Sequence, residues 1–216
     1  MIMNQEVNAD FSDEEKDMLQ EIMNIAFGNA TADLAEVIDI YVMLSVPNVK
    51  AIGIGALPDY LKKTIHEDGE SSIVEQKFWG NFKGSGLLVF PSGSGKVILA
   101  FLDNKESRDY NGSAADTLEK GGLLEIGNIL IGACVGKISE LLNTFVTYSP
   151  PQVLQGEQNK FDHLVEHFDP QQKAIVMKTI FTFKEKDISG FLLILTNHES
   201  FDWLRKALKD FMDSYE

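Results

Sequence analysis

Two acid–amide pairs stand out among the polar residues of this chain. Glu21 is followed by Asn24, and Glu125 is followed by Asn128, so both pairs have the same spacing. Residues three apart in an α-helix lie on the same face, so the carboxylate and the carboxamide would be neighbours. A carboxamide both donates and accepts hydrogen bonds and can orient a water molecule, while a carboxylate can bind a cation on a partner. These residue types predict hydrolysis of an already labile phosphoryl group.

Other chemistries fit these pairs less well. Nucleophilic catalysis needs Ser, Cys or Lys beside a base, and neither pair provides them. A two-metal carboxylate site needs Glu-x-x-His, and a neutral amide is a weak ligand for transition metals. We therefore expect the chain to hold no metal or other cofactor of its own, and any Mg²⁺ to be carried by a substrate protein.

The two pairs belong to an internal repeat with an offset of 104 residues. QEIMNIAFGNA at 20–30 aligns with LEIGNILIGAC at 124–134, and SVP at 45–47 aligns with SPP at 149–151. A repeat of this size predicts two similar structural units. The expected organisation is a mobile tail at 1–10, followed by one domain of two halves at about 11–106 and 115–216.

Each half is predicted to contain one long helix, at 12–39 and at 116–143, because apolar residues recur there at helical spacing. The offset pairs Ser12 with Asp116 and Glu15 with Glu119. Each pair of capping residue and glutamate resembles a capping box at a helix start.

The remaining elements follow from apolar runs and from the prolines. Pro47 and Pro151 are expected to begin extended segments. Four strands are predicted at 71–82, 85–90, 174–183 and 189–195, two shorter helices at 95–103 and 200–212, a loop at 69–72 and a linker at 107–116. The fold class is α+β: two pseudo-symmetric halves share an antiparallel sheet, and each half contributes one long motif-bearing helix.

Helical periodicity places both acid–amide pairs on exposed faces. The exposed stripe of the first helix includes Asp17, Ile25 and Gly28, and that of the second includes Ile129 and Gly132. The opposite, buried faces are predicted to consist of Leu19, Met23, Ala26, Ala30, Leu34 and Val37 in the first helix, and Leu123, Leu130, Cys134, Ile138 and Leu141 in the second. Small residues in line, Gly28, Ala32, Gly132 and Gly136, predict close approach of another protein to both exposed faces.

Composition narrows the class of protein. The chain has 216 residues, 44% of them hydrophobic, which is typical of a globular protein with a real core. The single cysteine, Cys134, excludes an intramolecular disulfide. A net charge of −14 predicts no nucleic-acid partner, and the absence of a signal-like N-terminus or a long uncharged apolar run predicts a cytoplasmic protein without a membrane partner.

The spacing Asp17-x3-Glu21-x2-Asn24-x22-Pro47 resembles the signature of the CheC/CheX/FliY family of chemotaxis phosphatases. Glu125-x2-Asn128-x22-Pro151 repeats it, and two copies resemble the CheC-like members. The resemblance implies hydrolysis of the aspartyl phosphate of a CheY-type response regulator. It implies that the asparagines orient water, that the glutamates contact a lysine of the regulator, that the prolines support the fold, and that CheD is a further partner.

The second copy departs from the signature at Gly121, where the family has Asp or Ser. The missing side chain predicts a weaker second site, and the adjacent Gly122 predicts a less regular helix start. The main alternative function is a CheC-like adaptor that binds phosphorylated regulator or CheD with little activity. A structural component of the flagellar switch is the third reading, and no additional switch domain is evident.

Two further motifs are interpreted as structural. His163-x2-Glu166-His167 has the spacing of a zinc-protease motif, but no third ligand follows it. Ser92-Gly-Ser-Gly-Lys96 resembles a phosphate-binding loop, but it lacks the flanking residues of that motif and is expected to be a strand-to-helix turn.

Overall fold

The computed structural model describes residues 12–38, 41–66, 71–102, 113–154, 165, 173–183, 188–196 and 198–213. The tail predicted at 1–10, the two histidines and the glutamate of the zinc-like motif lie outside these residues.

The described elements alternate between helices and antiparallel strands, which confirms the α+β class. In chain order they are α1 (Asp13–Ile38), β1 (Val42–Leu44), β2 (Asn48–Gly53), a 3₁₀ turn (Ile54–Ala56), α2 (Leu57–His66), β3 (Ser71–Gly80), β4 (Gly84–Pro91), α3 (Ser94–Leu102), α4 (Ser113–Leu141), β5 (Val146–Tyr148), β6 (Gln152–Leu154), β7 (Lys173–Phe183), β8 (Ile188–Thr196) and α6 (His198–Asp213).

One sheet contains strands from both sequence repeats. Its order is β1-β7-β8-β4-β3-β5, with β2 also paired to β7 and β6 also paired to β3. All of these pairings are antiparallel. The short strands β1 and β2 thus pair with a long strand from the second repeat, and β5 and β6 pair with a long strand from the first. Each repeat therefore completes the sheet of the other.

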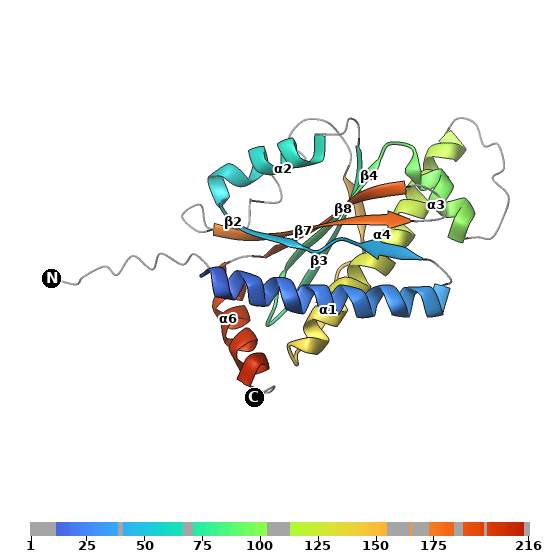
Figure 1. Cartoon of the computed structure of the whole chain (residues 1–216). Helices are drawn as coiled ribbons and strands as arrows, with labels where there is room; N and C mark the ends of the chain where they lie inside the picture. Colours follow the sequence, from blue (N-terminus) through green and yellow to red (C-terminus); the bar gives the residue numbers. More distant parts are fainter. Residues whose placement is uncertain are drawn as a thin grey trace.

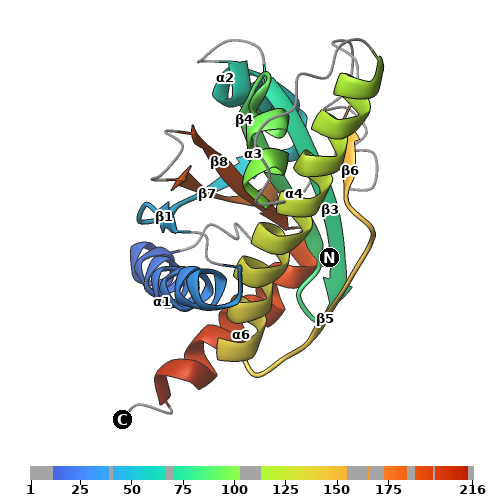
Figure 2. The ribbon, with the colours of Figure 1, turned by 90° about the vertical axis from the view of Figure 1, so that its right-hand side faces the viewer.

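Helices cover the two faces of the sheet unequally. Figure 1 shows α2 on one side of the sheet and α1, α4 and α6 on the other. The larger hydrophobic core lies beneath α1, α4 and α6, and the smaller core lies beneath α2. Figure 2 shows α4 running along the molecule, with α1 on one side and β3, β5 and β6 on the other. Helix α4 is therefore the central helix of the larger core.

The first predicted capping box is confirmed. The Ser12 backbone N–H donates to Glu15 Oε2 at 2.9 Å, and the Glu15 backbone N–H donates to Ser12 Oγ at 3.1 Å. These bonds satisfy amide groups that the first turn of α1 leaves unpaired. Arg205 on α6 also pairs with the Glu15 carboxylate, with Nη2 and Oε2 3.0 Å apart. The same carboxylate therefore caps α1 and ties it to α6.

The second predicted capping box is wrong. Helix α4 begins at Ser113, so Asp116 lies inside the first turn and the expected linker at 107–116 is shorter. Glu119 instead accepts a hydrogen bond at 3.1 Å from the backbone N–H of Gly93, in the turn before α3. The helix is continuous through Gly121 and Gly122, so the expected irregularity at these glycines is not observed.

Two backbone hydrogen bonds form a C-cap at the end of α4. The Thr144 N–H donates to Ser139 O at 2.8 Å, and the Asn143 N–H donates to Glu140 O at 3.0 Å. Asn143 has a φ of 50°, the left-handed conformation that this helix ending requires. The predicted end at residue 143 therefore includes the cap as well as the helix.

The four long strands and the two shorter helices are confirmed, but the sequence reading missed α2 and left the short strands only as extended segments. Ser71 and Ser72, where the predicted loop at 69–72 overlaps the predicted strand at 71–82, belong to β3. In the glycine-rich stretch at 92–96, residues 92–93 form a turn, with Gly93 at a φ of 83°, and α3 begins at Ser94. Its interpretation as a strand-to-helix turn is confirmed.

By length and composition alone, one segment, Thr117–Leu141 of α4, is long and apolar enough to cross a membrane. The expectation from sequence did not identify it, because Glu125 interrupts its apolar run. The structure gives another reason for its apolar character, since the helix packs into the larger core and against α1, α3 and the sheet.

Candidate functional site

The first acid–amide pair lies on the outer side of α1. Asp17, Glu21, Asn24 and Gly28 are exposed, and Ile25 beside them is 37% exposed. The opposite side of the helix enters the larger core through Leu19, Met23, Ala26 and Ala30, as predicted, and through Ile22 and Phe27. The side chains of Leu34 and Val37 lie outside the described part of the structure. Periodicity therefore located this exposed stripe correctly.

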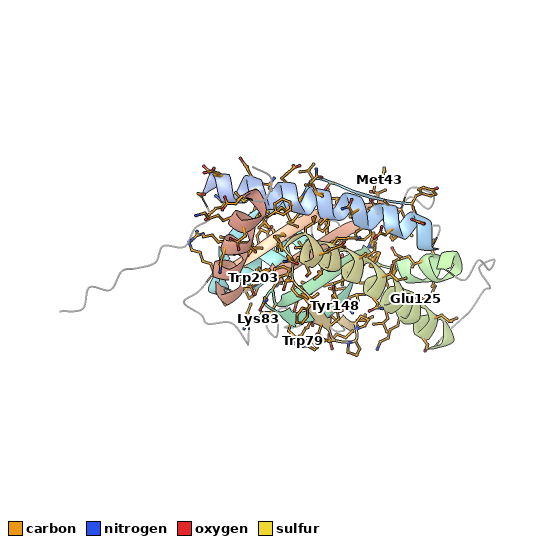
Figure 3. The ribbon with its side chains drawn as sticks, turned by 90° about the horizontal axis from the view of Figure 1, so that it is seen from below. Met43, Trp79, Lys83, Glu125, Tyr148 and Trp203 are labelled. Carbon is orange, nitrogen blue, oxygen red and sulfur yellow. The ribbon has the colours of Figure 1, made fainter. Side chains whose placement is uncertain are left out.

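The second pair lies on α4 and is flanked differently. Glu125 and Asn128 are exposed, and Figure 3 shows Glu125 on the outer side of the helix. The predicted core residues Leu123, Leu130, Cys134 and Ile138 are buried, and Leu141 is partly buried. Ile129, expected to be exposed, is half-buried and packs against the core. The reason is that α4 has neighbours on more sides than α1.

Tyr148 of β5 lies against the small residues of α4, where a partner protein was expected to approach. Its hydroxyl donates to the Gly132 carbonyl at 3.3 Å, and a Cβ added at Gly136 would lie 3.6 Å from the Tyr148 oxygen. Burial raises the pKa of Tyr148 to about 12, so the phenol stays protonated and can donate. Gly132 and Gly136 are half-buried, so Tyr148 covers part of the small-residue stripe on α4. A Cβ added at Gly132 would nevertheless meet open space, as one added at Gly28 of α1 would.

Two glycines allow α4 to pack tightly on the sheet. A Cβ added at Gly127 would come within 2.6 Å of Val74 on β3, and one at Gly86 on β4 within 2.5 Å of Ile131 on α4. The repeat equivalent of Gly127 is Met23, whose side chain is fully buried in the larger core. A side chain therefore lies beneath α1 at the position where α4 has none.

A serine anchors the motif loop of the first repeat. The Ser45 N–H donates to Ile180 O at 2.8 Å, and Ser45 Oγ accepts from the Ile180 N–H at 2.9 Å. Thr179 Oγ1 donates to Ser45 O at 2.6 Å. These bonds come from β7, and they fix the loop that leads to Pro47, which is buried between β1 and β2.

Ser149 anchors the second motif loop in the same way. Its N–H donates to Lys77 O at 2.9 Å, and its Oγ accepts from the Lys77 N–H at 3.1 Å. Gln76 Nε2 takes the place of the Thr179 hydroxyl and donates to Ser149 O at 3.0 Å. Pro151, between β5 and β6, is half-buried. Each loop is therefore held by a long strand of the other repeat.

The longer side chain of Gln76 also reaches the candidate site. Gln76 Nε2 donates a second hydrogen bond, 2.8 Å long, to Asn128 Oδ1. Among the described residues, none makes a hydrogen bond to the side chain of Asn24. The two candidate asparagines thus have the same sequence context but different support.

The site residues offer little for metal or thiol chemistry. Within the described ranges, no three His, Cys, Asp or Glu side chains are grouped so as to hold a metal ion. Cys134 is fully buried in the core, and burial raises the pKa of its thiol to about 12. The arrangement instead presents one carboxylate and one carboxamide on each of two exposed helix faces, where a second protein can reach them.

The chain is similar to known chemotaxis and flagellar proteins. The model of the CheC-like family matches residues 14–50. The CheY-P phosphatase CheC of Bacillus subtilis is 23% identical over 200 residues, which cover 91% of this chain and 94% of that protein. The flagellar motor switch phosphatase FliY of the same species is 23% identical over 144 residues, covering 67% of this chain and 36% of FliY.

The fold has a solved counterpart. The crystal structure of Thermotoga maritima FliY superimposes with a TM-score of 0.64 at 20% identity, and the match covers 95% of this chain and 99% of the other. Together with the repeated motif, the family model and the two relatives support the resemblance to the CheC/CheX/FliY family, and to its CheC-like members, that the sequence predicted.

Analysis of the sequence missed Gln76, Thr179 and Tyr148. Their types do not match across the repeat, and each acts on an element distant in sequence. The available signal was the polar run Glu75-Gln76-Lys77 between apolar residues of β3; Glu75 and Gln76 are buried, at 0% and 2% exposure. Buried polar residues in a strand require partners. Gln76 finds them in the other repeat, whereas Glu75 accepts from Ser85 of its own repeat and from Gln152 of the other.

Proposed function

We propose that this chain is a protein phosphatase that hydrolyses the aspartyl phosphate of a CheY-type response regulator in the cytoplasm. The observation that carries the proposal is the pair of exposed Glu-x2-Asn motifs on equivalent helices of a CheC-like fold. Support comes from the relative named as a CheY-P phosphatase, which aligns over nearly the whole chain.

In the proposed reaction, the regulator docks on the exposed face of α1 or α4. Asn24 or Asn128 uses its amide to hold a water molecule in line with the phosphorus–oxygen bond. The water oxygen bonds to phosphorus while the bond to the aspartate oxygen breaks, and the water proton leaves with the phosphate or passes to solvent. The products are inorganic phosphate and the free aspartate of the regulator.

The other site residues have binding roles in this proposal. Glu21 and Glu125 contact a cationic side chain of the regulator, and Asp17 adds a second carboxylate at the first site. Ile25 and Gly28 on α1, with the half-buried Ile129 and Gly132 on α4, form the contact surface. Mg²⁺ arrives on the phosphorylated regulator, where it neutralises phosphoryl charge. CheD, the second expected partner, rests on the family resemblance alone.

The test is multiple turnover. The decay of regulator phosphoaspartate is followed with the chain at one hundredth of the regulator concentration. We expect the decay to accelerate and every regulator molecule to be dephosphorylated. A phosphatase turns over, whereas an adaptor that only binds can change the decay of at most a stoichiometric fraction. Tight binding without turnover would therefore replace the proposal with the adaptor function.

A further inference from the structure

Two candidate sites that share a sequence motif differ in a residue outside it. On β7, Thr179 donates to Ser45 O at 2.6 Å, and no described residue makes a hydrogen bond to the Asn24 side chain. On β3, Gln76 donates to Ser149 O at 3.0 Å and to Asn128 Oδ1 at 2.8 Å. Both sites thus have a hydrogen bond from a neighbouring strand to the serine carbonyl of the motif loop. Among the described residues, only the second site also has a hydrogen bond from that strand to its asparagine.

Anchoring the motif loop through Gln76 leaves a polar atom of its side chain unpaired. Its side chain is 2% exposed, and its Oε1 atom is buried without a hydrogen-bond partner among the described residues. An unpaired buried carbonyl destabilises a fold. Thr179 shows that a short hydroxyl side chain anchors the equivalent loop without such an atom. Compared with Thr179 at the first loop, Gln76 makes one additional hydrogen bond, to Asn128.

The close packing of α4 makes that bond possible. Gly127, next to Asn128, leaves no side chain between the helix and Val74 of β3. At the equivalent position of α1 the side chain of Met23 is fully buried in the larger core. The hydrogen bond between Gln76 and Asn128 therefore depends on two residues, Gln76 itself on β3 and Gly127 on α4.

We infer that Gln76 is a positioning residue that fixes the Asn128 amide for catalysis at the second site. This inference rests on the proposed phosphatase function. The bond uses one lone pair of Oδ1 and sets the direction of the amide, so that the other lone pair and both Nδ2 hydrogens remain for water and phosphoryl oxygens. No described residue restrains Asn24 in this way, so its amide must be ordered when the regulator binds. The second site is thus preorganised, and the first is not.

The test isolates the second site with Asn24→Ala and then replaces Gln76 by Thr, the residue of the other loop anchor. Thr retains a hydroxyl for the Ser149 carbonyl but is too short to reach Asn128. We expect Gln76→Thr to lower kcat by about tenfold, the effect of one lost hydrogen bond, and to change KM by less than about twofold. In an Asn128→Ala background, where the first site carries the activity, the same change should have no comparable effect on kcat.

Thr179→Val is the matched control, because it removes the loop anchor of the other site. In the Asn24→Ala background it should leave kcat within about twofold, whereas a general loosening of the sheet would lower kcat with either substitution. If Gln76→Thr does not fold, Gln76→Met tests the same bond with a side chain of similar length. Equal losses of kcat in the Asn24→Ala and Asn128→Ala backgrounds, or no loss in a folded protein, would overturn the inference.

A second readout does not depend on activity. Nuclear magnetic resonance relaxation of the side-chain NH₂ groups should show Asn128 more ordered than Asn24, and Gln76→Thr should remove the difference. If the wild-type chain hydrolyses no phosphoaspartate while this difference is present and depends on Gln76, the proposed function fails and the restraint stands. If the two amides are equally mobile, the positioning role is wrong whatever the activity.

Discussion

Leu88 and Leu192 occupy equivalent positions in the two repeats, 104 residues apart, and they are also register partners across β4 and β8. An approximate twofold axis that relates the repeats must pass between them. Both side chains are buried in the larger core, at 0% and 1% exposure. The two repeats therefore pack against each other through this pair of equivalent leucines, one from each repeat.

This relationship predicts matched losses of stability. Leu88→Ala and Leu192→Ala should each lower the free energy of unfolding by about 2–5 kcal/mol, because each removes buried methyl groups and leaves a cavity. The two losses should agree within about 1 kcal/mol, and the double substitution should be non-additive because the side chains are neighbours. Urea unfolding measures all three, with the exposed Val97→Ala as the control. Clearly unequal losses would contradict equivalent packing of the two leucines.

The contact between Glu15 and Arg205 predicts a dependence of stability on pH. Burial alone would raise the Glu15 pKa, but hydrogen bonds from Ser12 and the nearby Arg205 guanidinium outweigh it and hold the pKa below its ordinary value of 4.5. A carboxyl whose pKa is lowered by folding stabilises the fold above its unfolded pKa, and the contribution is lost as pH falls through the folded pKa.

Glu15→Gln should therefore lower the free energy of unfolding by about 1 kcal/mol at pH 7, since the pair is only partly buried. The difference from wild type should shrink as pH falls below 4.5, the ordinary pKa of the carboxyl. Glu14→Gln, at the exposed neighbouring position, is the control and should have little effect at any pH. A Glu15→Gln deficit that stays constant down to acid denaturation would show that the carboxylate charge does not stabilise α1.

Local signals predicted the long elements well. The hydroxyl of Ser12 and the carboxylate of Glu15 act within one turn, so the start of α1 was predictable from four consecutive residues. Asp116 and Glu119 carry the same pattern, but α4 starts earlier and Glu119 binds the turn before α3. A capping pattern predicts a helix start only where no other partner competes for the glutamate.

The exposed stripe of α1 was predictable for a similar reason, since one side of that helix faces solvent. Periodicity failed for α4 at Ile129, because neighbours surround more of that helix, and Tyr148 returns to cover part of the helix at Gly132. The contact between Gln76 and Asn128 was not predictable, since it depends on the exchange of short strands between the repeats. Contacts of this kind follow from sheet order, which no local pattern specifies.

The donor set of each site predicts how hydrolysis depends on Mg²⁺. The first site supplies Asp17, Glu21 and Asn24, and the second supplies Glu125 and Asn128. Both sets offer fewer oxygen ligands than a protein cage for Mg²⁺ needs. We therefore expect the rate to follow Mg²⁺ occupancy of the regulator, and calorimetry of the chain alone with MgCl₂ to show no binding tighter than millimolar. A metal ion that copurifies with the chain and is required for its activity would contradict this expectation.

The difference between Asp17 and Gly121 predicts unequal affinities. Asp17 gives the first site a polar contact that the second lacks, and one exposed contact changes affinity several-fold. The second site, isolated by Asn24→Ala, should therefore have a KM several-fold higher than the first site, isolated by Asn128→Ala. Gly121→Asp in the Asn24→Ala background should lower KM, and open space around Gly121 leaves room for the new side chain. Equal KM values for the two single asparagine variants would show that Gly121 does not matter.

The central claim is that Asn24 and Asn128 carry the hydrolysis, and the most direct test is the phosphoaspartate decay rate of a CheY-type regulator with wild-type chain and with the Asn24→Ala/Asn128→Ala variant. We predict that the variant is about 10²–10³-fold slower than wild type, the usual effect of removing a polar catalytic group. Both side chains are exposed, so the urea midpoint should stay close to that of wild type. A folded double variant that retains wild-type activity would contradict the claim.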